Sequence, residues 1–379
     1  MNHTGTSIDD APRRSDVRPL LRVSNLAVDA TTRQRTARLL SDVTLEVAAG
    51  STLGVVGESG SGKSLTALSV MGLLPSGLSV ASGTIGFQDQ NLVGMDTRSF
   101  RKIRGSRVGM IFQDPQNSLN PAYTIGSQLI ETIRVHDESL SRSAAKARAV
   151  ELLERVGIGR AVRRLGDYPH QFSGGMAQRV MIALAISCEP SLLIADEPTT
   201  ALDVTVQLQI LSLLRSIQVE MDMTLVLISH DLSVIAQMAD DVAVMYAGEV
   251  VEYGNTAQVF RNPQHPYTAA LLGAQPDAKD NNGRLSVIRG TVPDAGTVLT
   301  GCKFRDRCDH AAAQCVEAHP ELVSEAGSSV RCLRASEITL SPVATPELRG
   351  SVTFTKPAKD VAVPALLTIE AVSKAFRLG

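Results

Sequence analysis

Short apolar runs alternate with longer amphipathic segments along most of the chain. Residues 51–57 (STLGVVG) have the pattern of a buried strand that ends at a glycine, and residues 191–196 and 223–229 are apolar runs of strand length. Residues 240–254 are typical of a hairpin with a glycine at the turn. Residues 141–157 have helical spacing and end at a glycine that is typical of a helix C-terminus. Strands that alternate with helices predict an α/β domain with a largely parallel core sheet.

The composition changes along the chain and indicates several segments. The first residues are poor in hydrophobic side chains and rich in Asp, Arg and Ser, which is typical of disorder. The residues after about 336 contain several prolines and have no sustained periodicity, which is typical of a linker. We therefore expect a disordered leader (1–18), a main α/β domain (19–260), a Cys- and Pro-containing C-terminal region (261–336) and a linker (337–365).

The last residues repeat the beginning of the main domain. LLTIEAVSKAF (366–376) aligns with LLRVSNLAVDA (20–30), with a paired leucine followed by an alternating strand pattern. The similarity predicts that a second copy of the main domain begins within residues 366–379, as in a tandem protein.

The segment GESGSGKS (57–64) fits the pattern G-x-x-x-x-G-K-[ST] and lies between a predicted strand and a predicted helix. Its glycines allow backbone N–H groups to surround an anion at a helix N-terminus. Lys63 is placed to reach the β- and γ-phosphates, and Ser64 to offer its hydroxyl to Mg²⁺. The predicted nucleotide-binding residues are Gly57, Glu58, Ser59, Gly60, Ser61, Gly62, Lys63, Ser64 and Leu65.

Two further strands end in polar residues that complete such a site. LLIADEP (192–198) delivers Asp196 towards a bound metal ion, and Glu197 follows on the opposite side, where it can polarise an attacking water molecule. In LVLISHD (225–231), His230 either contacts the γ-phosphate or is an ordinary loop histidine.

The segment QFSGGMAQRVMIALAI (171–186) resembles the signature segment of ABC ATPases, with two glycines that open a predicted helix. Across residues 20–336 the motifs follow the order of that family: phosphate loop, MIFQDP, signature, LLIADEP, TALD and ISHD. The resemblance implies a P-loop NTPase fold with a RecA-like core, a mainly parallel sheet, an antiparallel β subdomain and a helical signature subdomain. A small Cys-rich C-terminal appendage is expected to follow.

The resemblance also implies a role for each matching residue. In this family the signature acts on the ATP of the opposite domain, so two domains clamp head to tail around two nucleotides. Glu197 is then the catalytic base, His230 the switch histidine and Gln113 a residue that contacts Mg²⁺ and couples to the membrane subunit. The expected cofactors are ATP and Mg²⁺, with Ser64, Gln113 and Asp196 as metal ligands. The residues expected at the partner domain are Ser173, Gly174, Gly175 and Asp203.

Four segments resemble the oligopeptide/dipeptide importers within this family, namely MIFQDPQNSLNP, PTTALDVTVQLQIL, SGGMAQRVMIA and NPQHPYTAALL. The resemblance implies an ATP-hydrolysing subunit on the cytoplasmic face of a bacterial membrane that powers peptide import. The implied partners are two membrane-spanning permease subunits, a second ATPase domain and, through the permeases, an extracellular peptide-binding protein. Import of nickel or another small solute is an alternative within the same group.

One position departs from the family pattern. Many ABC ATPases stack the adenine ring on an aromatic residue shortly after the first strand, but here the corresponding residue is Ala30. Loss of such stacking removes about 1 kcal/mol, which predicts weaker or less base-selective ATP binding.

Charge and hydropathy argue against other classes of protein. The formal net charge is −2, so no overall positive charge favours nucleic acid, and a DNA-acting ABC ATPase is the less favoured alternative. An exporter ATPase is disfavoured by NPQHPYT and the cysteines after the ATPase motifs. The N-terminal segment has no apolar h-region, and no apolar run approaches the ~18 residues of a membrane helix.

Four of the five cysteines lie near the end of the chain, with the spacing C-x₅-C-x₆-C-x₁₆-C. Without a secretory signal, clustered cysteines favour metal or redox chemistry over disulfides. Four thiolates suit Zn²⁺ or an iron–sulfur cluster, but no Cys-x-x-Cys pair of a zinc ribbon is present. GCKFRDRCDHAAAQC resembles the segment of peptide-importer ATPases that can carry a [4Fe–4S] cluster. The expected ligands are Cys302, Cys308, Cys315 and Cys332, and the alternatives are Zn²⁺ and four reduced thiols.

Charged residues between the first of these cysteines add one expectation. Lys303, Arg305 and Arg307 should partly neutralise an anionic thiolate site. Cys188, in an apolar helical stretch, is expected to be a core residue.

Overall fold

The computed structural model describes residues 18–32, 35–200, 202–275, 287–294, 297, 299–325 and 327–340. Almost all of the predicted leader (1–18), most of the predicted linker (337–365) and the whole predicted repeat (366–379) lie outside the described residues.

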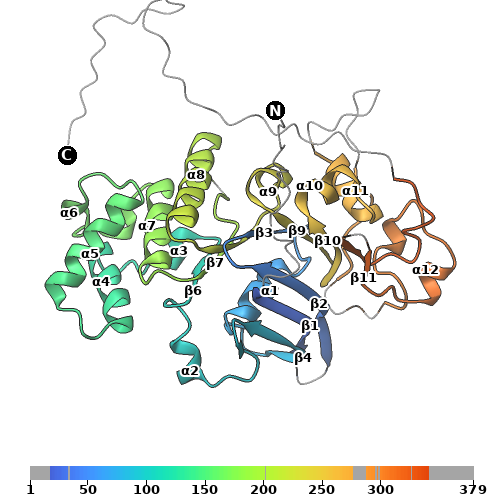
Figure 1. Cartoon of the computed structure of the whole chain (residues 1–379), viewed down its shortest axis with the longest axis horizontal. Helices are drawn as coiled ribbons and strands as arrows, with labels where there is room; N and C mark the ends of the chain where they lie inside the picture. Colours follow the sequence, from blue (N-terminus) through green and yellow to red (C-terminus); the bar gives the residue numbers. More distant parts are fainter. Residues whose placement is uncertain are drawn as a thin grey trace, which may run out of the picture. The chain divides into compact units, whose positions relative to one another are not determined.

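The centre of the described chain is an eight-stranded sheet in the order β11-β12-β10-β9-β3-β8-β7-β6 (Figure 1). Neighbouring strands from β9 to β6 pair in parallel, and β10, β12 and β11 continue the sheet with antiparallel pairing. The predicted α/β class and the largely parallel core are therefore confirmed. The strands are β3 (Thr52–Val56), β6 (Val108–Ile111), β7 (Leu192–Asp196), β8 (Thr224–Ile228), β9 (Asp241–Tyr246), β10 (Glu249–Asn255), β11 (Val323–Glu325) and β12 (Ser328–Val330).

Both faces of the parallel part of this sheet are covered. Leu193 and Ala195 of β7 pack into a core shared with the long helices, whereas Leu192 and Ile194 pack into a second core on the opposite face. An antiparallel sheet in the order β2-β1-β4-β5 packs into the second core. Because neither face meets water, the central strands are apolar runs without alternation. The covering elements are β1 (Pro19–Thr31), β2 (Thr36–Ala48), β4 (Leu78–Phe87), β5 (Gln90–Asn91) and α1 (Lys63–Val70).

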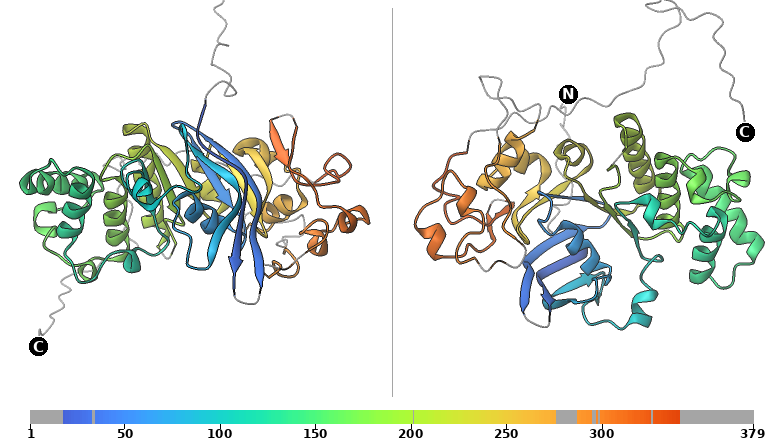
Figure 2. Two further views of the ribbon diagram at one scale, coloured as in Figure 1. Left: turned by 90° about the horizontal axis from the view of Figure 1, so that it is seen from below. Right: turned by 180° about the vertical axis from the view of Figure 1, so that it is seen from behind.

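Most of the remaining helices form the opposite layer and one end of the described domain, whereas Phe100 of the short helix α2 packs into the second core. Figure 2 shows α4, α5 and α6 grouped at one end of the central sheet, with the C-terminal region at the other. Helix α5 begins after the capping hydroxyl of Ser141 and ends just before Gly157, as the sequence predicts. None of the helices described is long and apolar enough to span a bilayer. The bounds are α2 (Thr97–Arg101), α3 (Pro115–Ser118), α4 (Ile125–His136), α5 (Arg142–Arg155), α6 (Ala161–Arg164), α7 (Gly174–Ile186), α8 (Val204–Glu220) and α9 (Leu232–Met238).

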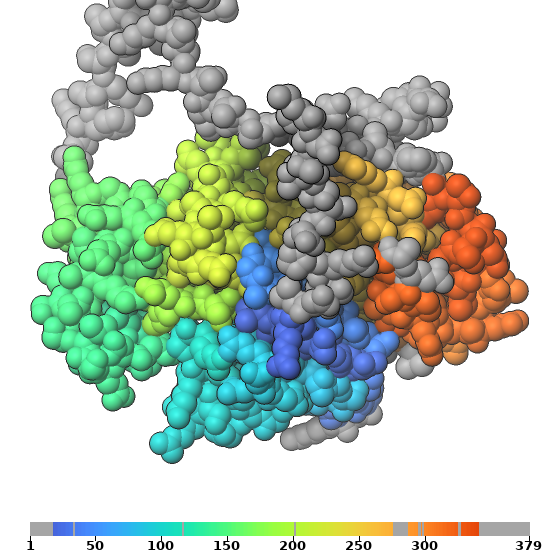
Figure 3. Space-filling view, in the orientation of Figure 1, coloured from blue at the N-terminus to red at the C-terminus, as the bar shows by residue number. Residues whose placement is uncertain are grey.

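The C-terminal region is part of the same body, so the expectation of a separate Cys-rich appendage is not supported. Strand β12 pairs with β10 and extends the central sheet, and Phe304 packs into the core that the long helices share. In the space-filling view this region lies directly against the segment around β10 and α11 (Figure 3). Its helices are α11 (Pro266–Gly273) and α12 (Gln314–Glu317), and α10 (Thr256–Arg261) leads into it.

Buried polar contacts fasten the C-terminal region to the sheet. Lys303 pairs with Glu249 of β10 at 2.9 Å, and the side chain of Glu249 is only 3% exposed. Arg331 is also buried, and it donates hydrogen bonds to the carbonyl of Val250 and to the carboxylate of Asp42. Leaving one member of such a buried pair without its partner costs several kcal/mol, which makes this attachment specific.

Glu252 lies fully buried at the same junction. Its carboxylate accepts the backbone N–H groups of Gln264 at 2.8 Å and His265 at 3.0 Å. Burial outweighs these hydrogen bonds and raises the pKa of Glu252 to about 7. The folded protein therefore keeps this proton over a pH range in which the unfolded chain has lost it.

We expect Glu252 to make stability depend on pH. The stabilisation from the protonated group is complete below about pH 4.5 and is lost as the pH rises towards 7, because the unfolded carboxyl loses its proton first. Relative to Glu252→Gln, the free energy of unfolding of the wild-type protein should fall by up to about 3 kcal/mol over this range. Urea unfolding at several pH values measures the difference. Exposed Glu317 offers a control, since Glu317→Gln should keep the wild-type pH dependence, and parallel curves for wild type and Glu252→Gln would contradict the prediction.

Candidate functional site

The predicted phosphate loop lies between the end of β3 and the start of α1. Two glycines shape it. Gly57 has φ +150°, and a Cβ atom there would lie 2.2 Å from the carbonyl oxygen of Met245. Gly62 has φ +103°, and a Cβ atom there would lie 2.6 Å from Leu40. The loop conformation therefore excludes side chains at both positions.

Lys63 begins α1 and points back over the loop. Its Nζ donates to the carbonyl oxygens of Gly57 at 2.7 Å and Glu58 at 3.0 Å. The lysine is buried, and burial lowers its pKa, although the carboxylates of Glu197, Asp196 and Glu58 oppose this shift. A cation held over a glycine-shaped loop at a helix start is suited to a polyphosphate.

The predicted magnesium ligands of two separate segments meet beside this loop. The hydroxyl of Ser64 donates to Oδ1 of Asp196 at 3.1 Å. Asp196 is 5% exposed, and burial raises its pKa. A hydroxyl and a buried carboxylate in contact are hard oxygen ligands of the kind that Mg²⁺ prefers, so these residues fit that ion.

Three other side chains, two of them from separate segments, meet at the carboxylate of Glu197. Its Oε2 accepts from Nε2 of Gln113 at 3.1 Å and from the hydroxyl of Thr200 at 2.8 Å, and Nδ1 of His230 lies 3.3 Å away. The structure thus brings together the three residues predicted as catalytic. Thr200 was not predicted; its place three residues after Glu197 in DEPTT was the available signal.

The backbone of Glu197 is itself unusual. Glu197 has φ +46°, in the left-handed region that non-glycine residues seldom adopt, and its N–H donates to the carbonyl of Ile228 at 3.0 Å. Strain of this kind persists only where surrounding structure holds it, and it is concentrated at functional sites. Here the neighbouring strand β8 holds the turn that aims the carboxylate.

The signature residues are organised but lie apart from the loop. Ser173 caps α7 and accepts the N–H of Met176 at 3.4 Å, while Asp203 caps α8 and accepts the N–H of Val206 at 3.0 Å. A Cβ atom on Gly175 would lie 2.8 Å from Val206, and Gly174 precedes it at the start of the same helix. In the described part of the chain, no hydrogen bond joins these residues to the phosphate loop, and the hydroxyl-bearing Ser173 is exposed.

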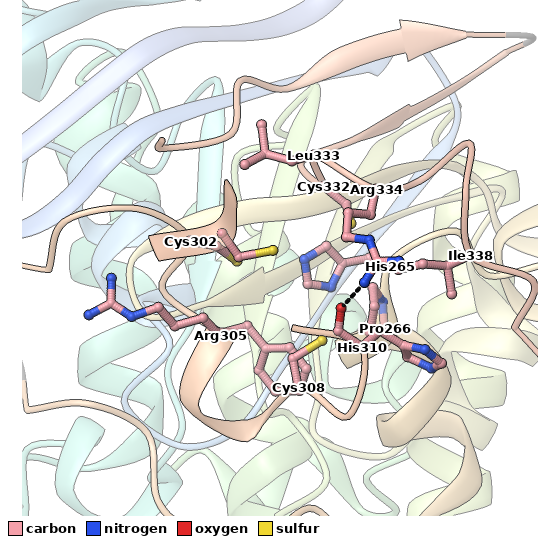
Figure 4. A pocket seen from close by; sticks show the side chains of 12 residues that line it. His265, Pro266, Cys302, Arg305, Cys308, His310, Cys332, Leu333, Arg334 and Ile338 are labelled. Carbon is pink, nitrogen blue, oxygen red and sulfur yellow. Dashed lines mark hydrogen bonds between the residues drawn. The ribbon is translucent and has the colours of Figure 1, made fainter. Parts of the chain in front are cut away.

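The four C-terminal cysteines line one cavity (Figure 4). Burial raises the pKa of Cys302 to about 11 and also raises those of the Cys308 and Cys332 thiols. Among the described residues, however, no group of three or more Cys, His, Asp and Glu side chains is arranged to hold a single metal ion. The four predicted ligands therefore line one cavity, but the described residues do not support the expected metal site there.

The expected neutralisation of these thiols by neighbouring cations is wrong. Lys303 pairs with Glu249, Arg307 with Glu58, and Arg305 with Asp306. The guanidinium that faces the cavity is that of Arg334, which donates to the carbonyl of His310 at 2.6 Å (Figure 4).

A second residue that the sequence reasoning missed is His265, on the cavity wall. It is buried, its Nδ1 accepts the N–H of Tyr267 at 3.0 Å, and burial lowers its pKa to about 3. Its place in NPQHPYT was the available signal. Cys188 lies elsewhere, half-buried just after α7.

Comparison with known proteins identifies the family. A family model described as ABC transporter matches residues 40–200, and one described as oligopeptide/dipeptide transporter, C-terminal region, matches residues 251–315. The dipeptide transport ATP-binding protein DppD of Haemophilus influenzae is 44% identical over 313 residues, which cover 83% of this chain and 94% of that protein. The chain belongs to the ABC transporter family, in its oligopeptide/dipeptide branch. A Brucella abortus protein whose name describes it as a peptide import ATP-binding protein is 48% identical over 314 residues, which cover 83% of this chain and 94% of that protein.

Solved structures of the family share the fold of the nucleotide-binding part. The ATP-binding cassette MJ0796, in a dimeric post-hydrolysis state bound to ADP and Pi, matches with a TM-score of 0.56 and 26% identity. The match covers 62% of this chain and 98% of MJ0796. The CbiO1 protein of Clostridium perfringens, part of the transporter complex CbiONQ, matches with a TM-score of 0.54 and 27% identity over 64% of this chain and 90% of CbiO1.

We expect Glu197→Gln to abolish ATP hydrolysis while leaving ATP binding intact. The amide keeps the size of the side chain but cannot take a proton from water, which should lower kcat by about 100-fold or more. Phosphate release and binding of a fluorescent ATP analogue measure the two effects separately. Glu189, an exposed acid paired with Arg148, provides the matched control Glu189→Gln. Unchanged hydrolysis in Glu197→Gln would contradict the prediction.

Proposed function

We propose that this protein binds and hydrolyses ATP to power the import of peptides through a membrane permease. The observation that carries the proposal is the convergence of Lys63, the Ser64–Asp196 pair and Glu197 at one edge of the central sheet. These groups supply what phosphoryl transfer to water requires: a phosphate cradle, a magnesium site and a carboxylate next to the attacking water.

Each residue around Glu197 has a separate role in hydrolysis. Glu197 holds and polarises the attacking water, and the hydroxyl of Thr200 orients its carboxylate. Gln113 and His230 touch the same oxygen, so both are placed to sense the nucleotide and the water. Lys63 neutralises charge on the β- and γ-phosphates. Ser64, Asp196 and Gln113 would hold Mg²⁺, which would supply further positive charge to the phosphates.

A second ATPase domain completes the site. Ser173, Gly174 and Gly175 present an exposed helix start, and Asp203 begins α8 beside them, which supports a role at the ATP of a partner domain. The structure of MJ0796, which is a dimer, supports this arrangement. We favour a second ATPase domain of the same chain as the partner, because the sequence predicts the start of a repeat at residues 366–379.

The permease partners bind next to Gln113. The preceding Phe112 is 38% exposed and Tyr123 is 56% exposed, both on the segment between β6 and α4. Exposed aromatic side chains are typical anchors of protein interfaces. The chain binds two membrane-spanning permease subunits at the cytoplasmic face of the membrane. These permeases receive peptide from an extracellular peptide-binding protein. Ala30 leaves the adenine ring without an aromatic partner at the usual position.

Peptide uptake in cells tests the proposed function. In a strain without its own peptide-importer ATPase, the wild-type chain together with its permease subunits should restore uptake of a radiolabelled dipeptide, and Glu197→Gln should not. Glu189→Gln again serves as the control that should restore uptake.

Parallel assays with radioactive nickel and with DNA-stimulated hydrolysis test the alternatives. Uptake of nickel without dipeptide would make the chain a nickel importer of the same group. ATPase activity that needs DNA and no permease would overturn the transport function.

We also propose that the four C-terminal thiols hold a [4Fe–4S] cluster. All four line one cavity, and an all-thiolate donor set suits iron–sulfur chemistry. The cluster would cross-link residues 302–332 to one another.

Iron and sulfide analysis of anaerobically purified protein tests this assignment. We expect about four irons and about four sulfides per chain, with an iron–sulfur absorption band, and loss of both in Cys308→Ser. Cys188→Ser should keep them, because Cys188 lies outside the cavity. Stoichiometric zinc without iron would make the site a zinc site, and metal-free protein would leave four reduced thiols.

A further inference from the structure

The phosphate loop carries a carboxylate next to the place proposed for a polyanion. Glu58, the second residue of the loop, lies against Arg307 of the C-terminal region. Nη1 of Arg307 donates to Oε2 of Glu58 at 2.6 Å, and Nη2 donates to Oε1 at 2.9 Å. This two-pronged geometry is the strongest and most directional contact between arginine and a carboxylate. The side chain of Arg307 is only 6% exposed, so salt screens the pair little.

The backbone of the same loop residue is held by a second side chain of that region. The N–H of Glu58 donates to the hydroxyl of Tyr267 at 2.9 Å. Tyr267 is fully buried, with its ring 4.7 Å from that of Tyr246 and 5.4 Å from that of Phe304. The hydroxyl is therefore fixed in place. Both the main chain and the side chain of Glu58 depend on residues more than 200 positions later in the sequence.

Arg307 is fixed on its other sides as well. Its Nε donates to the carbonyl of Arg289 at 2.7 Å, and its guanidinium lies 5.6 Å from the centre of the Tyr246 ring. The contact with Glu58 raises the pKa of Arg307, so its positive charge is permanent. The next residue is Cys308 on the wall of the thiol cavity. The segment between Cys302 and Cys308 thus links that cavity to the phosphate loop.

The charge of Glu58 reaches the phosphate-binding lysine. Burial lowers the pKa of Lys63. The negative charges of Glu197, Asp196 and Glu58 oppose this shift and favour the protonated lysine. A carboxylate close enough to act on Lys63 is close enough to repel a triphosphate bound by Lys63. Arg307 neutralises that charge and holds the carboxylate through both of its oxygens.

We propose that Arg307 is a positioning residue for the phosphate loop, which neutralises Glu58 and, together with Tyr267, holds the loop in the shape that receives ATP. The C-terminal region then supports nucleotide binding directly. This inference rests on the proposed ATPase function and adds to it a specific dependence of ATP affinity on the C-terminal region.

Steady-state hydrolysis and titration with a fluorescent ATP analogue test the inference in the full chain. Arg307→Ala should raise both KM and Kd for ATP about tenfold, equivalent to about 1.4 kcal/mol, with kcat at saturating ATP within about twofold of wild type. The double variant Arg307→Ala with Glu58→Gln should recover most of the lost affinity, because the repelling charge is gone. A role of Arg307 that does not act through the charge of Glu58 predicts no such recovery.

Arg305 offers a matched control two residues earlier in the same segment. Its guanidinium extends away from the cavity and donates to the carbonyl of Thr300, so Arg305→Ala should leave KM and Kd unchanged (Figure 4). If Arg307→Ala does not fold, Arg307→Lys carries the test. It keeps the charge but loses the two-pronged contact, and should raise KM by a smaller factor that Glu58→Gln again reverses.

Two results would overturn the inference in a protein that hydrolyses ATP. One is an Arg307→Ala variant with the KM of Arg305→Ala, and the other is a loss of affinity that Glu58→Gln does not restore. A wild-type chain that neither binds nor hydrolyses ATP would instead overturn the proposed function, and this inference with it.

Discussion

The site depends on the register of three parallel strands that are buried on both faces. Ile228 of β8 lies opposite Val55 of β3 on one side and Asp196 of β7 on the other. Because these three residues are neighbours across the sheet, the phosphate loop, Asp196 with Glu197, and the turn at His230 follow at the same edge. A slip of one residue would turn Asp196 to the opposite face and move Ser64 out of its reach. Because both faces of these strands are buried and apolar, the polar residues at their ends, rather than an in/out alternation, mark the register that the site requires.

The sequence predicts the parts of this arrangement that depend on local patterns. Local patterns predict the same local structure whatever the rest of the fold is. Such patterns here are the apolar runs of strand length, the glycine loop followed by Lys63, and the acids at the end of LLIAD. The helix that ends at Gly157 is a similar case. The contact of Thr200 with Glu197 could not be predicted, because its geometry depends on the left-handed turn at Glu197, which Ile228 at the end of β8 holds through a backbone hydrogen bond. Side-chain partners across the fold are a tertiary property.

The C-terminal region shows the same limit more sharply. Its Pro- and Cys-rich composition suggested a separate appendage, yet β12 joins the central sheet and Phe304 joins the main core. Lys303 and Arg307 were expected at the thiols because they neighbour the cysteines in sequence. The fold sends both charges the other way, to Glu249 and Glu58, because a buried carboxylate without a partner costs more than a thiol that stays protonated.

A carboxylate in a loop built for phosphate is unfavourable on its own, and its presence here has a physical explanation. Glu58 is tolerated because Arg307 cancels its charge and because Tyr267 takes its N–H away from the loop interior. The reverse also holds, since Arg307 is nearly buried and would be costly without Glu58. Each residue is therefore acceptable only in the presence of the other, and a chain that carries Glu58 in its phosphate loop needs the C-terminal region in order to bind ATP well.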